Sequence, residues 1–319
     1  MITVPAPAEA GAFVHPALFY QGLDEYLTGV GGFVRGALSA DEPVLVAVPG
    51  AHLDALRETL GASTAEVTWT DMTDLGRNPG RILAALQDFA DRHANRSARI
   101  VGEPIWPGRS PAEVLEATRH EALINTAFAG RPATILCPYD VRGLAPAVVA
   151  DARRTHPLLI ERGEDLPSTA YTDASRVSAD CDLPLPEPDG PVLRHEYTFG
   201  GLAEVREQAE TWTRATSLPP ERRGDLVLAI SEAAANSLAH GGGKGTLRLW
   251  TTAGTGTREI VAEIQDGGRL ADPLAGRRRP SLASAHGGRG LWMIHQLCDL
   301  VEVRATDSGL TLRLHVETP

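Results

Sequence analysis

The chain has 319 residues, 43% of them hydrophobic, and its 30 basic and 41 acidic residues give a formal net charge of −11. The hydrophobic share excludes wholesale disorder, and the length favours two domains because single cores stop growing efficiently beyond roughly 250–300 residues. An acidic surface is a poor partner for nucleic acid or an anionic membrane, which attract clustered Lys and Arg. We therefore expect no direct contact with either.

Cysteine use and the N-terminal sequence bear on whether the protein is secreted or stays in the cytoplasm. Cys137, Cys181 and Cys298 are far apart and form no CxxC pair, so their spacing favours neither a disulfide framework nor a zinc site. No basic region followed by an apolar run marks a secretory signal, and no apolar stretch reaches the about 18 residues of a membrane-spanning helix. The sequence accordingly predicts a cytoplasmic protein.

In the N-terminal half, short apolar runs bounded by turn residues alternate with amphipathic helical patterns. Strands are expected at 43–49, 67–72, 98–106 and 133–140, and helices at 25–38, 53–60, 80–93, 112–127 and 144–155. Strand–helix alternation of this kind predicts a parallel α/β sheet with helices on both faces.

A composition shift divides the chain. Residues 163–193 are rich in Pro, Asp and Ser and have no sustained apolar period, and LPLPEPDGP is their stiffest part. Such a composition is typical of an extended linker. We therefore expect an N-terminal domain at 13–162, a linker at 163–193 and a C-terminal domain at 194–319.

The C-terminal half has a different order of elements. A strand at 194–199 precedes a helix at 202–215 and a second helix that runs from the Leu218-Pro219-Pro220 turn through Leu238. Two strands follow within 246–266, then a helix at 290–297 and two final strands. This order predicts a two-layer α/β sandwich, in which helices cover one face of an antiparallel-rich sheet.

Two polar residues stand out on the second helix of this half. Glu232 and Asn236 are four residues apart, so their side chains project from one helical face. A carboxylate and a carboxamide one turn apart can hold a hydrated Mg²⁺ and a reacting hydroxyl, because Mg²⁺ prefers oxygen ligands. Taken alone, the pair is more commonly a solvated helix face.

Glycines accompany an acidic residue and an arginine further along the chain. Asp266 ends a predicted strand directly before Gly267 and Gly268, where it can accept a hydrogen bond from an exocyclic amine while the backbone approaches the ring. Gly288 and Gly290 flank Arg289 at the start of a helix, and a glycine-rich helix N-terminus is a cradle for phosphates. The intervening LADPLAGRRRPSLASAHG, with its arginines at 277–279, has the composition of a mobile lid with an anion clamp.

The ordered set Glu-x-x-x-Asn, Asp-x-Gly and Gly-x-Gly-Leu resembles the GHKL (HATPase) ATPases, most closely the anti-sigma-factor serine kinases that control stress and sporulation sigma factors. The resemblance covers about 194–319 and implies that the domain uses ATP and Mg²⁺. It implies that Asn236 binds Mg²⁺, that Glu232 is the general base for a partner's serine, and that Asp266 reads adenine beside Gly268. It also implies that the Thr311 hydroxyl supports the Asp–adenine contact, and that Gly288, Arg289 and Gly290 bind the phosphates.

Two residues within the ATPase motifs need comment. Where the family often reads DxGxG, the chain has Leu270, which lowers the expectation of rapid turnover more than that of nucleotide binding. His240 stands at a position commonly His in the family, and we expect a structural role for it.

A histidine kinase would carry its phosphoacceptor histidine on long helices just before the ATPase domain, where this chain has a proline-rich linker. His120 lies far upstream and is expected to be a surface helix residue.

The N-terminal half resembles the MEDS sensory domain, a module linked to sensing of small hydrocarbon derivatives, over about 13–159. The matching text is HPALFY, FVRGALSADEPVLVAVP, RNPGRIL, RIVGEPIWPGRSPAEVLEATRHEALIN and ILCPYD. Candidate ligand residues are His15, Tyr20, Glu103, Glu121, Cys137, Tyr139 and Asp140. Glu103 is favoured because the carboxyl ends of parallel strands form the binding crevice. His15 and Cys137 can together bind a soft metal, although such residues are more commonly a packed His and a buried Cys.

The leading hypothesis is an anti-sigma regulatory protein with ATP-dependent serine-kinase activity. It would sequester a sigma factor and phosphorylate an anti-anti-sigma partner of the STAS type, gated by a small molecule at the N-terminal domain. One alternative is a non-catalytic, ATP-binding partner-switching module. The other is a small-molecule sensor with a vestigial ATPase domain. Family members commonly dimerise through the ATPase domain, so a homodimer is expected.

Overall fold

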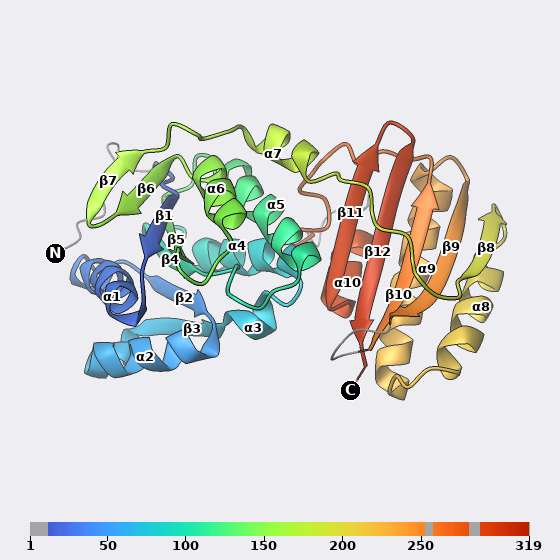
Figure 1. Ribbon diagram of the computed structural model, residues 1–319, viewed down its shortest axis with the longest axis horizontal. Helices are drawn as coiled ribbons and strands as arrows, with labels where there is room; N and C mark the ends of the chain where they lie inside the picture. Colours follow the sequence, from blue (N-terminus) through green and yellow to red (C-terminus); the bar gives the residue numbers. More distant parts are fainter. Residues whose placement is uncertain (1–11, 253–257, 281–287, 319) are drawn as a thin grey trace. The chain divides into compact units, whose positions relative to one another are not determined.

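The computed structural model describes residues 12–252, 258–280 and 288–318, and these fall into two units, Met1–Ser178 and Ala179–Pro319 (Figure 1). Each unit has its own sheet. Within the described ranges, none of the helices combines the length and apolarity needed to cross a membrane. The fold class expected from the sequence, a parallel α/β unit followed by a two-layer α/β sandwich, is confirmed.

Seven strands form the sheet of the N-terminal unit, in the order β3-β2-β4-β5-β1-β6-β7. Their bounds are β1 (Pro16–Tyr20), β2 (Val44–Val48), β3 (Val67–Asp71), β4 (Ala98–Gly102), β5 (Ala133–Asp140), β6 (Leu158–Glu161) and β7 (Glu164–Pro167). Neighbouring strands are parallel except for the antiparallel pair β6 and β7. The central strands β2 and β5 are apolar and almost wholly buried, as strands covered on both faces must be.

The helices of this unit form two layers. They are α1 (Leu23–Ser39), α2 (Gly50–Leu60), α3 (Met72–Leu75), α4 (Ile82–Arg92), α5 (Pro111–Ala127) and α6 (Pro146–Thr155), with short 3-10 turns η1 (Gly61–Glu66) and η2 (Pro79–Arg81). The crossovers through α1 and α2 run along the sheet in one direction, and those through α4, α5 and α6 run back in the other. Because such crossovers are right-handed, the two groups cover opposite faces of the sheet (Figure 1).

Reversal of the crossover direction creates crevices at the carboxyl edge of the sheet. The segments after β2 and β4, which are neighbours, leave toward opposite faces, and so do those after β5 and β1. Ligands of open α/β sheets bind at such switch points. The first residue beyond β4 is Glu103, so the fold places the favoured candidate at this edge.

Three secondary-structure elements and the burial of one histidine differ from what the sequence led us to expect. The expected linker at 163–193 contains β7 and α7 (Ala174–Asp180), and β6 extends the sheet beyond the last predicted helix. His120 is 1% exposed on α5, so its assignment as a surface residue was wrong. That helix is covered along most of its length, because it packs between α4 and α6.

The C-terminal unit is a five-stranded antiparallel sheet with three helices on one face (Figure 1). Its elements are β8 (Leu193–Thr198), α8 (Leu202–Arg214), α9 (Pro220–His240), β9 (Lys244–Thr252), β10 (Glu259–Asp266), α10 (Arg289–Leu297), β11 (Leu300–Thr306) and β12 (Gly309–Glu317). The strand order is β11-β12-β10-β9-β8. The core lies between the sheet and the helices and includes Ile230, Ala234, Leu247, Ile264 and Leu314.

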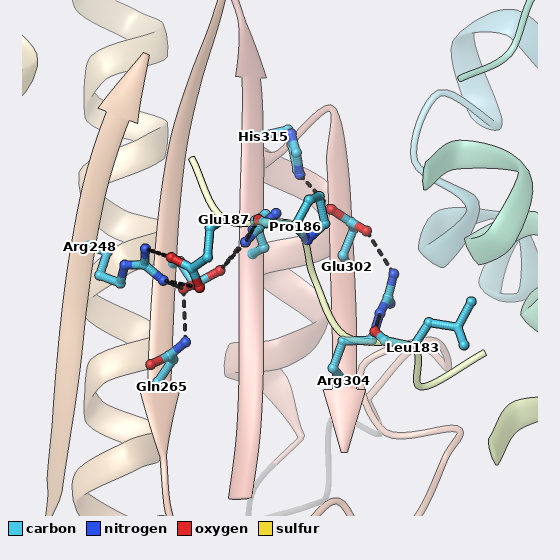
Figure 2. A network of polar contacts seen from close by, with 10 residues as sticks. Leu183, Pro186, Glu187, Arg248, Gln265, Glu302, Arg304 and His315 are labelled. Atoms are coloured by element: carbon cyan, nitrogen blue, oxygen red, sulfur yellow. Dashed lines mark hydrogen bonds and ion pairs between the residues drawn. The ribbon is translucent and has the colours of Figure 1, made fainter. Parts of the chain in front are cut away.

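The second face of this sheet is crossed by residues 182–187, which we call the strap (Figure 2). Arg304 donates to the Leu183 carbonyl at 3.0 Å, and Arg313 donates to the Pro186 carbonyl at 2.9 Å. The Asp182 carboxylate accepts from the Ala305 N–H at 3.1 Å. Part of the expected linker is therefore an ordered cover of the sheet.

Glu263 lies under the strap and binds two arginines. Its side chain is fully buried, and it accepts from Arg313 at 2.6 and 2.8 Å and from Arg248 at 2.8 Å. Arg248 also pairs with Glu187 of the strap, while Gln265 donates to Glu263 at 3.0 Å (Figure 2). A buried charge requires this degree of pairing, because an unpaired one loses its hydration without compensation.

We expect Glu263→Ala to destabilise the C-terminal unit by about 3–5 kcal/mol, because it leaves two largely buried guanidinium groups without their shared carboxylate. Urea unfolding followed by far-ultraviolet circular dichroism measures the change. The matched control is Glu196→Ala, which removes an exposed partner of Arg194 and is expected to cost less than about 1 kcal/mol. Equal losses in the two variants would contradict this assignment.

Candidate functional site

A cavity of 190 Å³ lies in the C-terminal unit, where α9 and the start of α10 meet the ends of β10 and β12. Its wall is part polar and part apolar. The polar part includes Asn236, His240 and Asp266, and the apolar part includes Leu270, Leu291, Leu310 and Leu312. Residues from four separate stretches of sequence therefore converge on one hollow.

Asp266 is held in place by two donors. The Ser237 hydroxyl on α9 donates to one carboxylate oxygen at 2.6 Å, and the Gly268 N–H donates to the other at 2.7 Å. Gly241, the C-cap of α9, passes so close that a Cβ there would lie 2.4 Å from the Asp266 Cγ. Glycine at this position thus permits the helix end and the carboxylate to meet. Each carboxylate oxygen keeps a lone pair with which to accept a hydrogen bond from a ligand.

The structure does not bring Thr311 to this cavity. Thr311 pairs with Gln265 across the sheet, whereas Leu310 pairs with Asp266. Because side chains alternate between the faces of a strand, Thr311 shares the strap side with Arg313, and Leu310 and Leu312 face the cavity. The expected support of Asp266 by the Thr311 hydroxyl is therefore wrong, and Ser237 supplies that hydroxyl.

Ser237 was not singled out from the sequence, although a signal was present. It lies among Ala233, Ala234 and Leu238 on the buried side of α9, and buried hydroxyls in helices need a partner. Its hydroxyl reaches both the Ala233 carbonyl and Asp266.

Glu232 and Asn236 lie next to the first turn of α10. A Cβ on Gly290 would lie 2.9 Å from a Glu232 carboxylate oxygen and 3.3 Å from the Asn236 amide nitrogen. Gly288 caps α10 in the left-handed region, with φ of 87°, and Arg289 is exposed at the first helical position. The amides of a helix start and an oxygen-rich pair of side chains thus face the same space.

The predicted lid lies partly outside the described residues, which omit 281–287. Within the described part, Leu270 packs against the core and lines the cavity, so it fills space that the expected glycine would leave open. Arg277 is 3% exposed, which does not fit an anion clamp, whereas Arg278 and Arg279 are exposed. His240 lines the cavity at the end of α9.

Six of the seven candidate ligand residues of the N-terminal unit fall into two clusters, and the seventh, Asp140 at the end of β5, accepts from the Arg142 N–H at 2.9 Å. One cluster is centred on the buried Glu103: Tyr20 donates to one carboxylate oxygen at 3.1 Å, while Tyr26 at 3.3 Å and His52 Nδ1 at 2.8 Å contact the other. Burial raises the pKa of Glu103 above its usual range, although these hydrogen bonds and the nearby His52 oppose the shift. The Tyr26 and His52 rings stack with centroids 4.1 Å apart. The second cluster contains His15 and Cys137, with Nε2 and Sγ separated by 3.4 Å.

Tyr26 and His52 were not expected from the sequence. His52 lies in the first turn of α2, directly after β2, and β2 is the neighbour of β4 in the sheet. A correct strand order would have placed it beside Glu103, but the strand order is not readable from a single sequence.

Comparisons with known proteins match both units. The sequence profile of the MEDS domain (MEthanogen/methylotroph, DcmR Sensory domain) matches residues 14–157, and that of the histidine kinase-like ATPase domain matches residues 198–316. Among curated proteins, none matches the chain significantly.

Two solved structures show similarity to the chain. The RsbU and RsbW domains of Rv1364c from Mycobacterium tuberculosis are 19% identical with a TM-score of 0.30, covering 67% of this chain and 50% of that one. The chain thus spans about half the length of that structure. The SiaB–SiaC complex from Pseudomonas aeruginosa is 10% identical with a TM-score of 0.28, covering 40% of this chain and 88% of that one.

The profile matches agree with the two folds described above. A histidine kinase-like ATPase domain implies that the C-terminal unit binds ATP. The protein therefore carries a MEDS domain at its N-terminus and a histidine kinase-like ATPase domain at its C-terminus.

Proposed function

We propose that the protein is an anti-sigma regulator whose C-terminal unit binds Mg²⁺-ATP and phosphorylates a serine of an anti-anti-sigma partner of the STAS type. In this account it also sequesters a sigma factor, and a small molecule at the N-terminal unit controls the switch. The observation that supports the kinase proposal is the convergence of Glu232, Asn236 and the start of α10 beside the cavity that holds Asp266.

The mixed polar and apolar lining of the cavity supports an adenine ring as its proposed occupant. The fixed Asp266 carboxylate can accept a hydrogen bond from the adenine amine, and Leu270, Leu291 and Leu312 offer an apolar surface to the ring. The N-terminal amides of α10, next to Gly288 and Gly290, would bind the phosphates. The smallness of residue 290 matters, because a side chain there would occupy the space beside Glu232.

In the proposed chemistry, the two polar residues of α9 have separate roles. The Asn236 carboxamide oxygen would hold Mg²⁺, and ATP supplies the phosphoryl group when bound. Glu232 would accept the proton of the attacking serine hydroxyl, and its place next to α10 puts that base near the expected phosphates. Arg289 at the helix start adds positive charge on the same side.

A second candidate function retains ATP binding and omits catalysis. It is favoured by Leu270, which packs against the core and lines the cavity where the kinases often have a glycine. The unit would then bind its partner in a manner set by the nucleotide. Binding and transfer therefore have to be measured separately.

We expect Ser237→Ala to weaken ATP binding about 10- to 100-fold, because Asp266 loses a charge-assisted hydrogen bond that orients its carboxylate. Thr311→Ala is the matched control and should change the Kd less than about twofold, since Thr311 lies on the opposite face of the sheet. Isothermal titration calorimetry gives both values. The reverse order of effects would show that the strand register or the site is assigned incorrectly.

We expect Glu232→Gln to keep the Kd for ATP within about threefold while phosphoryl transfer falls at least about 100-fold, because the amide cannot accept the serine proton. Transfer from labelled ATP is followed on a candidate STAS-type partner, with its serine-to-alanine variant as the control substrate. A wild-type chain that binds ATP without transferring phosphate would favour the second candidate function. Wild-type protein that fails to bind ATP would favour the remaining alternative, a small-molecule sensor with a vestigial ATPase domain.

A further inference from the structure

Four buried side chains of different chemistry meet inside the N-terminal unit. They are His15 just before β1, Glu121 in α5, Cys137 in β5 and His156 at the end of α6, and each is at most 1% exposed. One potential ligand atom from each lies within 4.8 Å of the other three. They come from four separate elements, so the cluster depends on the packing of the whole unit.

The separations fit ligands around one ion. Nε2 of His156 is 2.8 Å from a Glu121 carboxylate oxygen, and Nε2 of His15 is 3.5 Å from the same oxygen. Cys137 Sγ is 3.4 Å from His15 Nε2. Metal–ligand bonds of about 2.0–2.3 Å in a tetrahedral site place the ligand atoms roughly 3.3–3.7 Å apart. The three separations above lie within about half an ångström of this range, and all four ligand atoms lie within 4.8 Å of one another.

Surrounding groups fix which nitrogen of each ring carries its proton. His15 Nδ1 is 3.1 Å from the Asn125 side-chain oxygen, and the Asn125 amide nitrogen is itself engaged with the Ala122 and Thr155 carbonyls. His156 Nδ1 is 2.8 Å from the Ala152 carbonyl, which can only accept, and 3.0 Å from the Thr155 hydroxyl, whose proton is directed at the Asp151 and Ala152 carbonyls. Both rings must therefore donate through Nδ1, and in the neutral rings both Nε2 lone pairs point into the cluster.

With both rings neutral and no cation bound, this arrangement is unfavourable. Two nitrogen lone pairs face a fully buried carboxylate, and His156 Nε2, although 2.8 Å away, is not in hydrogen-bond geometry with it. In the part of the chain that the structure describes, no group hydrogen-bonds to the second carboxylate oxygen, Oε1, of Glu121. Tyr139 donates to Oε2 at 3.2 Å, and when both rings are neutral the buried carboxylate has no cation beside it.

We propose that His15, Glu121, Cys137 and His156 bind one divalent transition-metal ion of the zinc class. The donor set of two imidazoles, a thiolate and a carboxylate matches the preference of Zn²⁺ for nitrogen, sulfur and oxygen ligands. Binding releases the thiol proton of Cys137 to solvent, so the thiolate and the carboxylate together balance the two positive charges. The result is an electrically neutral site, which suits complete burial. The ion would link β5 and the residue before β1 to α5 and the end of α6.

The test uses the full chain, expressed with Zn²⁺ in the medium and purified without a metal-affinity tag. Mass spectrometry of the metal content is expected to give one Zn²⁺ per chain. Replacement of Zn²⁺ by Co²⁺ is expected to give the near-ultraviolet thiolate-to-cobalt band together with strong visible bands of a tetrahedral ion. Cys181→Ser/Cys298→Ser, which leaves Cys137 as the single cysteine, should keep both the metal content and the band.

Two further variants sharpen the assignment. Cys137→Ser should abolish the thiolate band and weaken Zn²⁺ binding at least about 100-fold, and Asn125→Ala, which leaves all four ligands, should weaken it about 10- to 100-fold. Fewer than about one tenth of an equivalent of Zn²⁺ in a folded wild-type chain would overturn the proposal. So would a thiolate band that survives Cys137→Ser or disappears in the double variant. The wild-type and double-variant measurements decide the matter even if Cys137→Ser fails to fold.

Discussion

The candidate nucleotide site depends on one carboxylate. Asp266 ends β10, yet its two oxygens are held by Ser237 of α9 and by the N–H of Gly268, and Gly241 at the end of α9 packs against its side chain. This contact links the helical layer to the sheet at the point where the cavity opens. It also fixes the direction in which the carboxylate can accept a further hydrogen bond. Leu310, Leu270 and Leu291 of α10 line the same cavity.

The two faces of the C-terminal sheet are stabilised by different interactions. Apolar side chains of alternate strand residues pack beneath α8, α9 and α10, where the hydrophobic effect holds the layers together. The other set carries charged residues, and these are covered by the strap and neutralised within the Glu263 network. The strap thus lets a sheet with arginines and glutamates on one side avoid an exposed, poorly paired face. Residues that looked like a linker therefore contribute to the stability of the unit.

Much of the fold could be predicted from the sequence because hydrophobic periods and turn residues report local structure directly. The helices of both units begin and end close to the expected residues, for instance α5, where Ser110 and Glu113 form a capping box. β1 and β6 were missed because five- and four-residue runs gain their stability from parallel partners far along the chain. The strap was missed for a related reason, since its order comes from arginines more than a hundred residues away.

The candidate sites, too, could be predicted from the sequence only in part. Motif spacing was enough to bring Glu232, Asn236, Asp266 and Gly290 together as candidates, because helix and strand periods fix their directions. It was not enough to choose between Leu310 and Thr311, because a shift of one residue exchanges the faces of a strand. The grouping of His15 with Glu121, Cys137 and His156 needed the strand order and the helix packing, which no local pattern contains.

The central claim is that Asp266 reads the amine of adenine, and nucleotide selectivity tests it most directly. Calorimetric titration of the wild-type chain with ATP and with GTP compares an amine with a carbonyl oxygen at the position that faces the carboxylate. The account predicts that ATP binds at least about 100-fold more tightly, because a carboxylate facing a carbonyl leaves two acceptors without a proton between them. Equal affinities for the two nucleotides, or binding of neither, would contradict it.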